Sequence, residues 1–310
     1  MEKWNLIIDV AECTNCNNCF LACKDEYVGN DFPGYSAPQP LHGHKWFYIE
    51  SREHGQYPMV DVAYRPTTCN HCNDAPCVRK STDGTVYQRP DGIVMIDPDK
   101  ARGKPDIVNT CPYGAIWWNE EEQVAQKWNF DAHLLDRGEP RLRCEQVCPT
   151  GVFRSLKVED DQMNRIIEDE ELQVLNPEFK ASPRVYYKNL DNFTKYFIGG
   201  TLLAVKDGVT DAASGVEIEL TQGGVTLQTG ESNEYGDFKF SGLNVDSGNF
   251  TLQFHSAEHG DFEITTELTQ STYLGTLTLP SPSHWCLLYT SDAADEGLGV
   301  DLGGGRIIKK

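Results

Sequence analysis

Four cysteines lie within eleven positions near the start of the sequence, in the stretch ECTNCNNCFLACKDE at residues 12–26. They are Cys13, Cys16, Cys19 and Cys23, and their spacing is C-x2-C-x2-C-x3-C. Three thiols at this spacing line a tight loop around one corner of an iron–sulfur cubane, and the last cysteine of such a run ligates a second cluster. Zinc also binds C-x2-C, but zinc sites use two separate pairs of ligands. The run therefore favours iron–sulfur clusters over zinc.

Two further cysteine groups follow, and each ends in a Cys-Pro pair. In bacterial ferredoxins the fourth ligand of a cluster comes from a remote segment and precedes a proline. The stretches TCPYGA and RCEQVCPTG both fit that role. The cysteines concerned are Cys69, Cys72, Cys77 and Cys111 in the second group, and Cys144 and Cys148 in the third.

The cysteine count and the charge narrow the class of protein. The sequence has 11 cysteines, of which 10 lie between positions 13 and 148, and we find no signal peptide. An odd, clustered set without a leader indicates metal thiolates in a reducing compartment rather than a disulfide scaffold, so we expect a cytoplasmic protein. The net charge of −20 makes nucleic acid an unsuitable partner. No apolar run approaches the roughly 20 residues of a membrane span, so we expect no direct membrane insertion.

Residues 1 to about 160 resemble the four-cluster ferredoxin subunits of the molybdopterin oxidoreductases in the dimethyl sulfoxide reductase superfamily. The resemblance implies an α+β fold in which two ferredoxin-like halves ligate clusters crosswise. It also implies a large partner subunit that contains molybdopterin and the active site. We find no catalytic residues in this chain, and its implied role is electron transfer.

The resemblance implies two complete ligand sets for two [4Fe-4S] clusters. The sets are Cys13, Cys16, Cys19 and Cys148 for cluster one, and Cys69, Cys72, Cys77 and Cys111 for cluster two.

The other two ligand sets of that family are incomplete in this sequence. The positions that correspond to cluster three hold Ser81, Ala101, Lys104 and Ile107, so all four ligands are missing. At cluster four, Cys23 and Cys144 remain, but Trp128 and Asp131 replace two cysteines. Asp131 could hold a three-iron cluster with the two cysteines, since a carboxylate oxygen can bind iron. Alternatively, Trp128 fills the vacated volume and the two thiols are free and buried.

A closer resemblance is to the small subunits of molybdenum transhydroxylases that act on polyhydroxylated aromatics in anaerobic metabolism. It rests on stretches such as HKWFYIESREHGQYP, YRPTTCNHCNDAPCV and TCPYGAIWWNEEEQVAQK. Two alternatives remain open: an electron-delivering subunit of another molybdopterin reductase, and a non-redox scaffold whose clusters stabilise its fold. His71 and His133 lie near the cysteine groups, and we interpret both as second-shell or surface residues.

Composition divides the chain into three parts. We predict an iron–sulfur domain at 1–195, with an insertion at 27–66 that contains two strands and either docks the partner or covers the clusters. The acidic stretch at 159–175 predicts a solvated helix. About seven short strands between turn residues predict an antiparallel β-sandwich at 196–280, similar to transthyretin and Cna-B modules. A tail at 281–310 follows, and 286–310, with Cys286, back-translates to a sequencing adapter.

Overall fold

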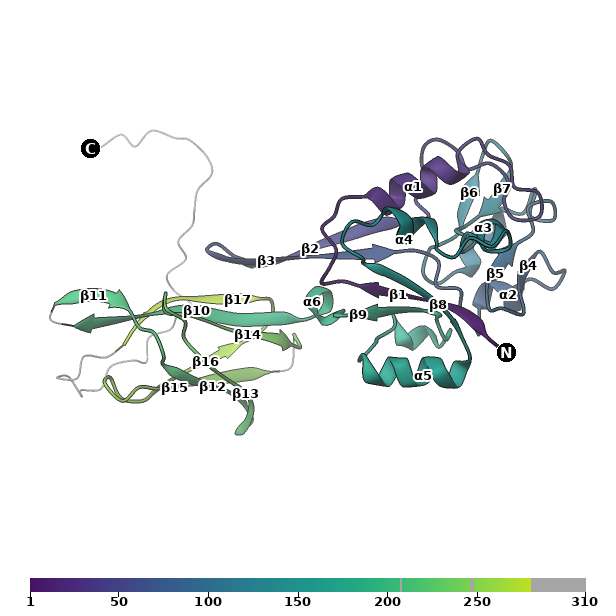
Figure 1. The fold of residues 1–310 in the computed structure, drawn as a ribbon. Coiled ribbons are helices and arrows are strands. Elements are labelled where there is room, and N and C mark those ends of the chain that lie inside the picture. Colours follow the sequence, from purple (N-terminus) through teal and green to yellow (C-terminus); the bar gives the residue numbers. More distant parts are fainter. Residues whose placement is uncertain (207, 246–247, 280–310) are drawn as a thin grey trace, which may run out of the picture. The chain divides into compact units, whose positions relative to one another are not determined.

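A computed structural model describes residues 1–206, 208–245 and 248–279 (Figure 1). The tail at 281–310, including the segment interpreted as translated adapter, lies outside the described residues. The chain forms two compact units. Unit one comprises Met1–Gly200, Lys239–Phe250 and Thr266–Leu274. Among the described residues, unit two comprises Thr201–Phe238, Thr251–Thr265 and 275–279.

A three-stranded sheet in the order β8-β1-β9 forms the centre of unit one. Strand β1 (Lys3–Asp9) pairs antiparallel with β8 (Phe153–Val158) and parallel with β9 (Val185–Lys188). Successive side chains of a strand point to opposite faces, so the apolar run of β1 serves two cores. Leu6 and Ile8 belong to the core that contains the first cysteine run, whereas Ile7 packs against Met163 of helix α5 (Asp160–Asp169).

The elements around this sheet are short, because closely spaced cysteine loops leave little chain for longer ones. The helices are α1 (Asn18–Tyr27), α2 (Pro76–Lys80), α3 (Ala132–Leu135), α4 (Arg143–Val147), α5 (Asp160–Asp169) and α6 (Asp191–Thr194), with 3-10 turns η1 (Pro105–Thr110) and η2 (Pro177–Phe179). Two small hairpins join β4 (Val86–Gln88) to β5 (Val94–Ile96) and β6 (Trp117–Asn119) to β7 (Val124–Gln126). Within the described residues, no helix is long and apolar enough to cross a membrane.

The helix predicted at 159–175 is shorter than expected, because α5 ends at Asp169. Glu171 adopts a left-handed backbone with φ of 52°, and the Leu172 N–H donates to the Ile167 carbonyl at 2.9 Å. This six-residue closure is the Schellman arrangement that terminates helices. It turns Leu172 back into the core beside α5, so the end of the stretch is buried rather than solvated.

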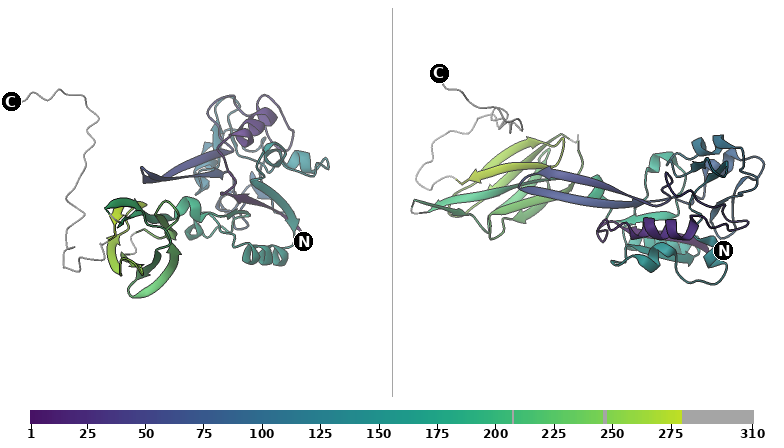
Figure 2. Two further views of the ribbon diagram at one scale, coloured as in Figure 1. Left: turned by 60° about the vertical axis from the view of Figure 1, so that its left-hand side comes forward. Right: turned by 90° about the horizontal axis from the view of Figure 1, so that it is seen from above.

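The insertion at 27–66 has two different parts. Up to Phe47 it folds back on unit one, where Tyr27, Trp46 and Phe47 are buried in the same core as the first cysteine run. The two predicted strands then form a hairpin, β2 (Tyr48–Gln56) and β3 (Met59–Thr67), in full antiparallel register. Both views of Figure 2 show this hairpin as a narrow ribbon leaving the part of the unit that contains α1.

The C-terminal part of the described chain consists of strands. They are β10 (Tyr196–Lys206), β11 (Val209–Ala212), β12 (Glu217–Gln222), β13 (Val225–Glu231), β14 (Asp237–Leu243), β15 (Asn249–His255), β16 (Phe262–Glu267) and β17 (Thr272–Thr278). One sheet has the order β11-β10-β14 with β17 also on β10, and the other has the order β13-β12-β15-β16. The seven predicted segments all form strands, and β11 is the strand that the sequence did not predict.

The two sheets share an aromatic core within unit two. Phe238 of β14 meets Phe254 of β15 with ring centroids 5.4 Å apart, and Phe254 stacks on Phe262 at 4.4 Å. Ile218 and Leu220, at alternate positions of β12, are fully buried. This alternation places one face of β12 in the core.

Candidate metal centres

The cysteines assigned to cluster one surround a single cavity in unit one. Cys13 and Cys16 come from the loop before α1, Cys19 comes from the first turn of α1, and Cys148 comes from the end of α4. The loop can wrap the cavity because Asn15 and Asn17 both have positive φ values, of 58° and 60°. Asparagine tolerates this left-handed conformation better than most residues.

Cys19 is the buried member of this set. The pKa of Cys19 is raised to about 12, mainly by burial, with smaller contributions from the neighbouring thiols Cys13, Cys16 and Cys148. Four ionised thiols at this cavity would repel one another, so they require a positively charged group bound between them. The Val152 N–H points at Cys148 Sγ from 3.4 Å, which is the kind of backbone donor that stabilises a cluster ligand.

The cysteines assigned to cluster two surround a second cavity. Cys69 and Cys72 come from the loop that leads into α2, Cys77 comes from the first turn of α2, and Cys111 follows η1. Burial raises the pKa of Cys77 to about 11 and raises that of Cys72 further. His71 also lines this cavity.

The donor chemistry of both cavities fits a [4Fe-4S] cluster. Each cavity offers four thiols, three from one loop and one from a remote segment, and the remote cysteine precedes proline in both cases. All ten described cysteines are free rather than paired in disulfides. The sequence placed each set of four together only through a resemblance, and the fold brings each set to one cavity.

The positions aligned with cluster three also come together, but polar side chains form hydrogen bonds and an ion pair there in place of a ligand set. Lys104 forms an ion pair with Asp83 and donates to Thr85 Oγ1 at 2.8 Å. Ser81 Oγ accepts the Val86 N–H at 2.8 Å and donates to Asp83 at 3.2 Å. The remaining contacts are between backbones: the Lys104 N–H donates to the Ala101 carbonyl, and the Ile107 N–H donates to the Lys104 carbonyl. Two of the four positions, Ser81 and Lys104, therefore carry side chains that both bind Asp83.

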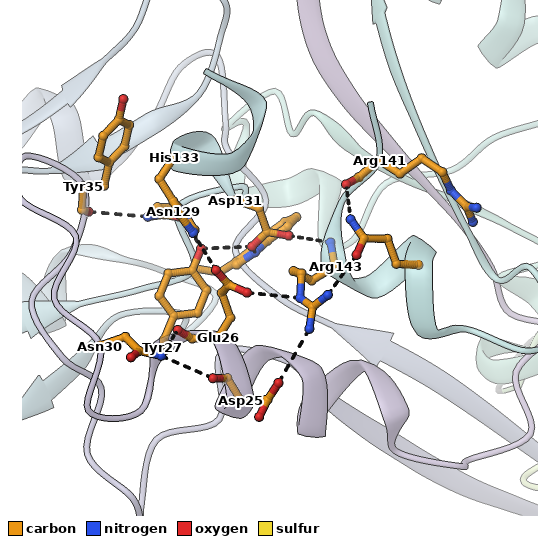
Figure 3. A network of polar contacts seen from close by, with 12 residues as sticks. Asp25, Glu26, Tyr27, Asn30, Tyr35, Asn129, Asp131, His133, Arg141 and Arg143 are labelled. Atoms are coloured by element: carbon orange, nitrogen blue, oxygen red, sulfur yellow. Dashed lines mark hydrogen bonds and ion pairs between the residues drawn. The ribbon is translucent and has the colours of Figure 1, made fainter. Parts of the chain in front are cut away.

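Asp131 occupies the centre of the fourth position, where protein donors already bind both carboxylate oxygens (Figure 3). Oδ1 accepts the Trp128 indole N–H and the Tyr27 hydroxyl, each at 2.9 Å. Oδ2 accepts the Arg143 backbone N–H at 2.9 Å. Burial raises the pKa of Asp131, while these three hydrogen bonds oppose the rise.

Trp128 is among the largest fully buried side chains, and its ring meets Phe47 edge-on at 4.7 Å. Cys23 and Cys144 are also buried, and burial raises the pKa of both thiols well above the ordinary value. The geometry thus matches the second of the two expected arrangements, in which Trp128 fills the volume and the thiols are buried.

The two histidines are both buried, so the surface alternative is wrong for each. His71 Nδ1 accepts the Val94 N–H at 3.1 Å, and burial lowers its pKa well below the usual range, so it is neutral. His133 Nε2 lies 2.9 Å from a Glu26 carboxylate oxygen in the network of Figure 3.

Lys127 is a buried residue of the second cavity that the sequence analysis did not single out. The sequence signal that could have identified Lys127 is its position immediately before Trp128, which stands at a replaced ligand position.

Comparison with known proteins agrees with this donor chemistry. The model of the 4Fe-4S dicluster domain family matches residues 60–158. The pyrogallol hydroxytransferase small subunit of Pelobacter acidigallici is 46% identical over 256 residues, which cover 82% of this chain and 90% of that protein. The chain belongs to the pyrogallol hydroxytransferase small subunit family. The prediction of that family from the sequence is confirmed.

More distant relatives of this hydroxytransferase subunit family are iron–sulfur subunits of other enzymes. The arsenate respiratory reductase iron-sulfur subunit ArrB of Shewanella sp. (strain ANA-3) is 27% identical and aligns with 60% of this chain and 95% of its own length. The thiosulfate reductase electron transfer subunit PhsB of Salmonella typhi is 28% identical, over 55% of this chain and 84% of its own length. The protein is therefore an iron–sulfur subunit of the molybdoenzyme type.

Proposed function

We propose that this chain is the electron-transfer subunit of a molybdenum transhydroxylase acting on polyhydroxylated aromatics such as pyrogallol. The observation that carries the proposal is the pair of complete four-thiol cavities in a chain of this family. The active site and molybdopterin belong to a large partner subunit. The complex works in the cytoplasm, without nucleic acid and without membrane insertion of this chain.

The chain holds two [4Fe-4S] clusters and no third. Each cluster supplies one-electron redox chemistry when bound. The protein holds it through four cysteines, shields it from water and aims backbone N–H groups at the thiolates. At the fourth position, Trp128 and the hydrogen-bonded Asp131 carboxylate occupy the space that a cubane would need.

Hydroxyl transfer between polyhydroxybenzenes is redox-neutral overall, so electrons need not leave the complex. A chain with this function tolerates loss of the clusters that would extend an electron path. If turnover stopped when the redox activity of the two remaining clusters was removed, the redox neutrality of the reaction would not explain the missing ligands of clusters three and four.

A second candidate function is electron delivery to another molybdopterin reductase, and the similarity to arsenate and thiosulfate reductase subunits favours it. Turnover that depends on an external electron donor would support this alternative. Clusters that keep one oxidation state throughout turnover would instead indicate a structural scaffold.

We propose the domain division 1–195, 196–280 and 281–310, with the first part forming two ferredoxin-like halves. Within the insertion at 27–66, the part before β2 covers the clusters and the β2–β3 hairpin docks the partner. Tyr57 at the hairpin tip is 91% exposed, and Val60 and Val62 are also exposed, which leaves apolar surface for that contact.

The test is anaerobic quantitation of iron and sulfide, with electron paramagnetic resonance, on the chain purified with its partner. About eight irons per chain would support two cubanes and a filled fourth position. About eleven or twelve would contradict it, because Asp131 and the two buried cysteines would then hold a third cluster. Fewer than about four would overturn the electron-transfer proposal itself.

A further inference from the structure

Lys127 places a buried cation at the second cysteine cavity. It follows β7, and its side chain lines the cavity together with Cys69, Cys72, Cys77 and Cys111. The residue is 4% exposed. Its ammonium group donates to the carbonyl oxygens of Val94 at 2.5 Å and Trp128 at 3.0 Å, which fixes its place in the wall.

This ammonium group has no carboxylate partner among the described residues, since its contacts are the two carbonyls. Burying an unpaired charge is costly unless another charge compensates it. The thiols that line the cavity are the groups that can do so. Burial raises the pKa of Cys77 and of Cys111, and the charge on Lys127 counteracts that rise in both.

The first cavity is built differently. The described residues that line it include threonine, asparagine, proline and apolar side chains besides the cysteines, but no lysine or arginine. Cys16 there is exposed to solvent, whereas Cys69, Cys72 and Cys77 are buried. Water can screen charge at the first site, while the second depends on groups that the protein supplies.

We propose that Lys127 is the built-in counter-charge of the second cluster and raises its reduction potential. The inference rests on the proposed function, because it requires a cluster held by these four cysteines. A cubane with four thiolates is an anion, and one-electron reduction makes it more negative. A fixed cation in a low-dielectric wall therefore stabilises the reduced form more than the oxidised form.

Redox titration monitored by electron paramagnetic resonance tests this on the complex with its partner. K127M and K127Q remove the charge, and glutamine retains a hydrogen-bond donor. K127R keeps the charge. We expect both neutral variants to lower the equilibrium constant for one-electron reduction of cluster two roughly tenfold or more, a shift of about 59 mV per tenfold to more negative potential. K127R should stay near the wild-type value, and the potential of cluster one should not move.

K104M is the matched control, because Lys104 is partly exposed, pairs with Asp83 and does not line the cavity.

An unchanged potential for an assembled cluster two in K127M and K127Q would overturn the proposal. Loss of cluster two in the neutral variants but not in K127R would support it, as the charge would then be needed to hold the anion. Loss of cluster two in K127R as well would overturn the proposal, because it would show that the shape of the lysine side chain, and not its charge, is needed to hold the cluster. Wild-type protein without a second cluster would instead refute the proposed function, and iron quantitation distinguishes that case.

Discussion

We propose that two substituted residues limit the number of clusters that the protein holds. Trp128 and Asp131 stand where two cysteines occur in the resembling subunits, and they bind each other through a 2.9 Å hydrogen bond. Tyr27 and the Arg143 backbone complete the shell around the carboxylate. A buried carboxylate is stable only when such donors surround it, so the two replacements work as a pair rather than as separate losses.

We predict that the double substitution W128C/D131C restores a third cluster. It removes the indole that fills the position and supplies two thiols beside Cys23 and Cys144, which completes a four-cysteine set. Iron should rise by about four atoms per chain after anaerobic reconstitution. D131C alone, which leaves the indole in place, should bind no additional iron. An unchanged iron content in the double variant would show that the position can no longer accept a cubane.

At the scale of elements, short segments are held together by side-chain pairs rather than by long packed faces. Arg89, at the end of β4, reaches Asp136 just after α3, with two nitrogen–oxygen distances of 2.8 and 2.7 Å. The Tyr35 hydroxyl donates to the same carboxylate at 2.8 Å. The Arg89 hydrogen bond is the main reason that the pKa of Asp136 lies below its usual value.

We predict that R89M destabilises the protein by about 1 kcal/mol at neutral pH. The pair is bidentate, which strengthens it, but Asp136 is partly exposed, so solvent screening reduces its contribution. Anaerobic denaturant unfolding of the iron-loaded protein measures the change. The matched control is R79M, because Arg79 and Asp74 form a more exposed ion pair. Equal losses in the two variants would contradict the assigned role of the bidentate pair.

We also predict that V60D and V62D weaken binding of the large partner by at least tenfold. Both valines are exposed on β3, so a carboxylate should leave the folding of the hairpin intact while opposing an apolar contact. Titration calorimetry or pull-down with the partner measures affinity, and thermal unfolding checks stability. V225D, at an exposed valine of β13, is the control. Wild-type affinity in both hairpin variants would exclude this surface as the docking site.

At the scale of the whole molecule, the two cysteine cavities are independent sites with different surroundings. They share no lining residue among those described. Among the described residues, no basic side chain lines the first, where Cys16 is exposed, whereas Lys127 lines the second. Loss of one cluster should therefore leave the coordination of the other unchanged.

We predict that C19S and C77S each remove about four irons and leave the other cluster spectroscopically intact. Cys19 belongs to the first set and Cys77 to the second, so each variant is the control for the other. Iron quantitation and electron paramagnetic resonance on the complex measure both effects. If either variant lost all its iron, the clusters would depend on each other for folding.

The sequence alone determined the chemistry of the sites and the kind of protein. Thiolate spacing is a local property, because three cysteines at i, i+3 and i+6 define one loop whatever surrounds it. The strands were also predictable where apolar and polar residues alternate. Strand β11 was missed because it is polar and largely exposed, and it forms only by pairing with β10.

The tertiary structure decided what no local pattern contains. It brings remote Cys111 and Cys148 to their cavities and fills the vacated fourth position with a hydrogen-bonded pair. It also ends α5 early at Asp169, through the left-handed backbone of Glu171. It also buries the Lys127 charge beside thiols from another segment. Whether a charge is buried and what compensates it depend on chain segments that meet only in the folded state, since burial sets the local dielectric and hence the strength of every charge interaction.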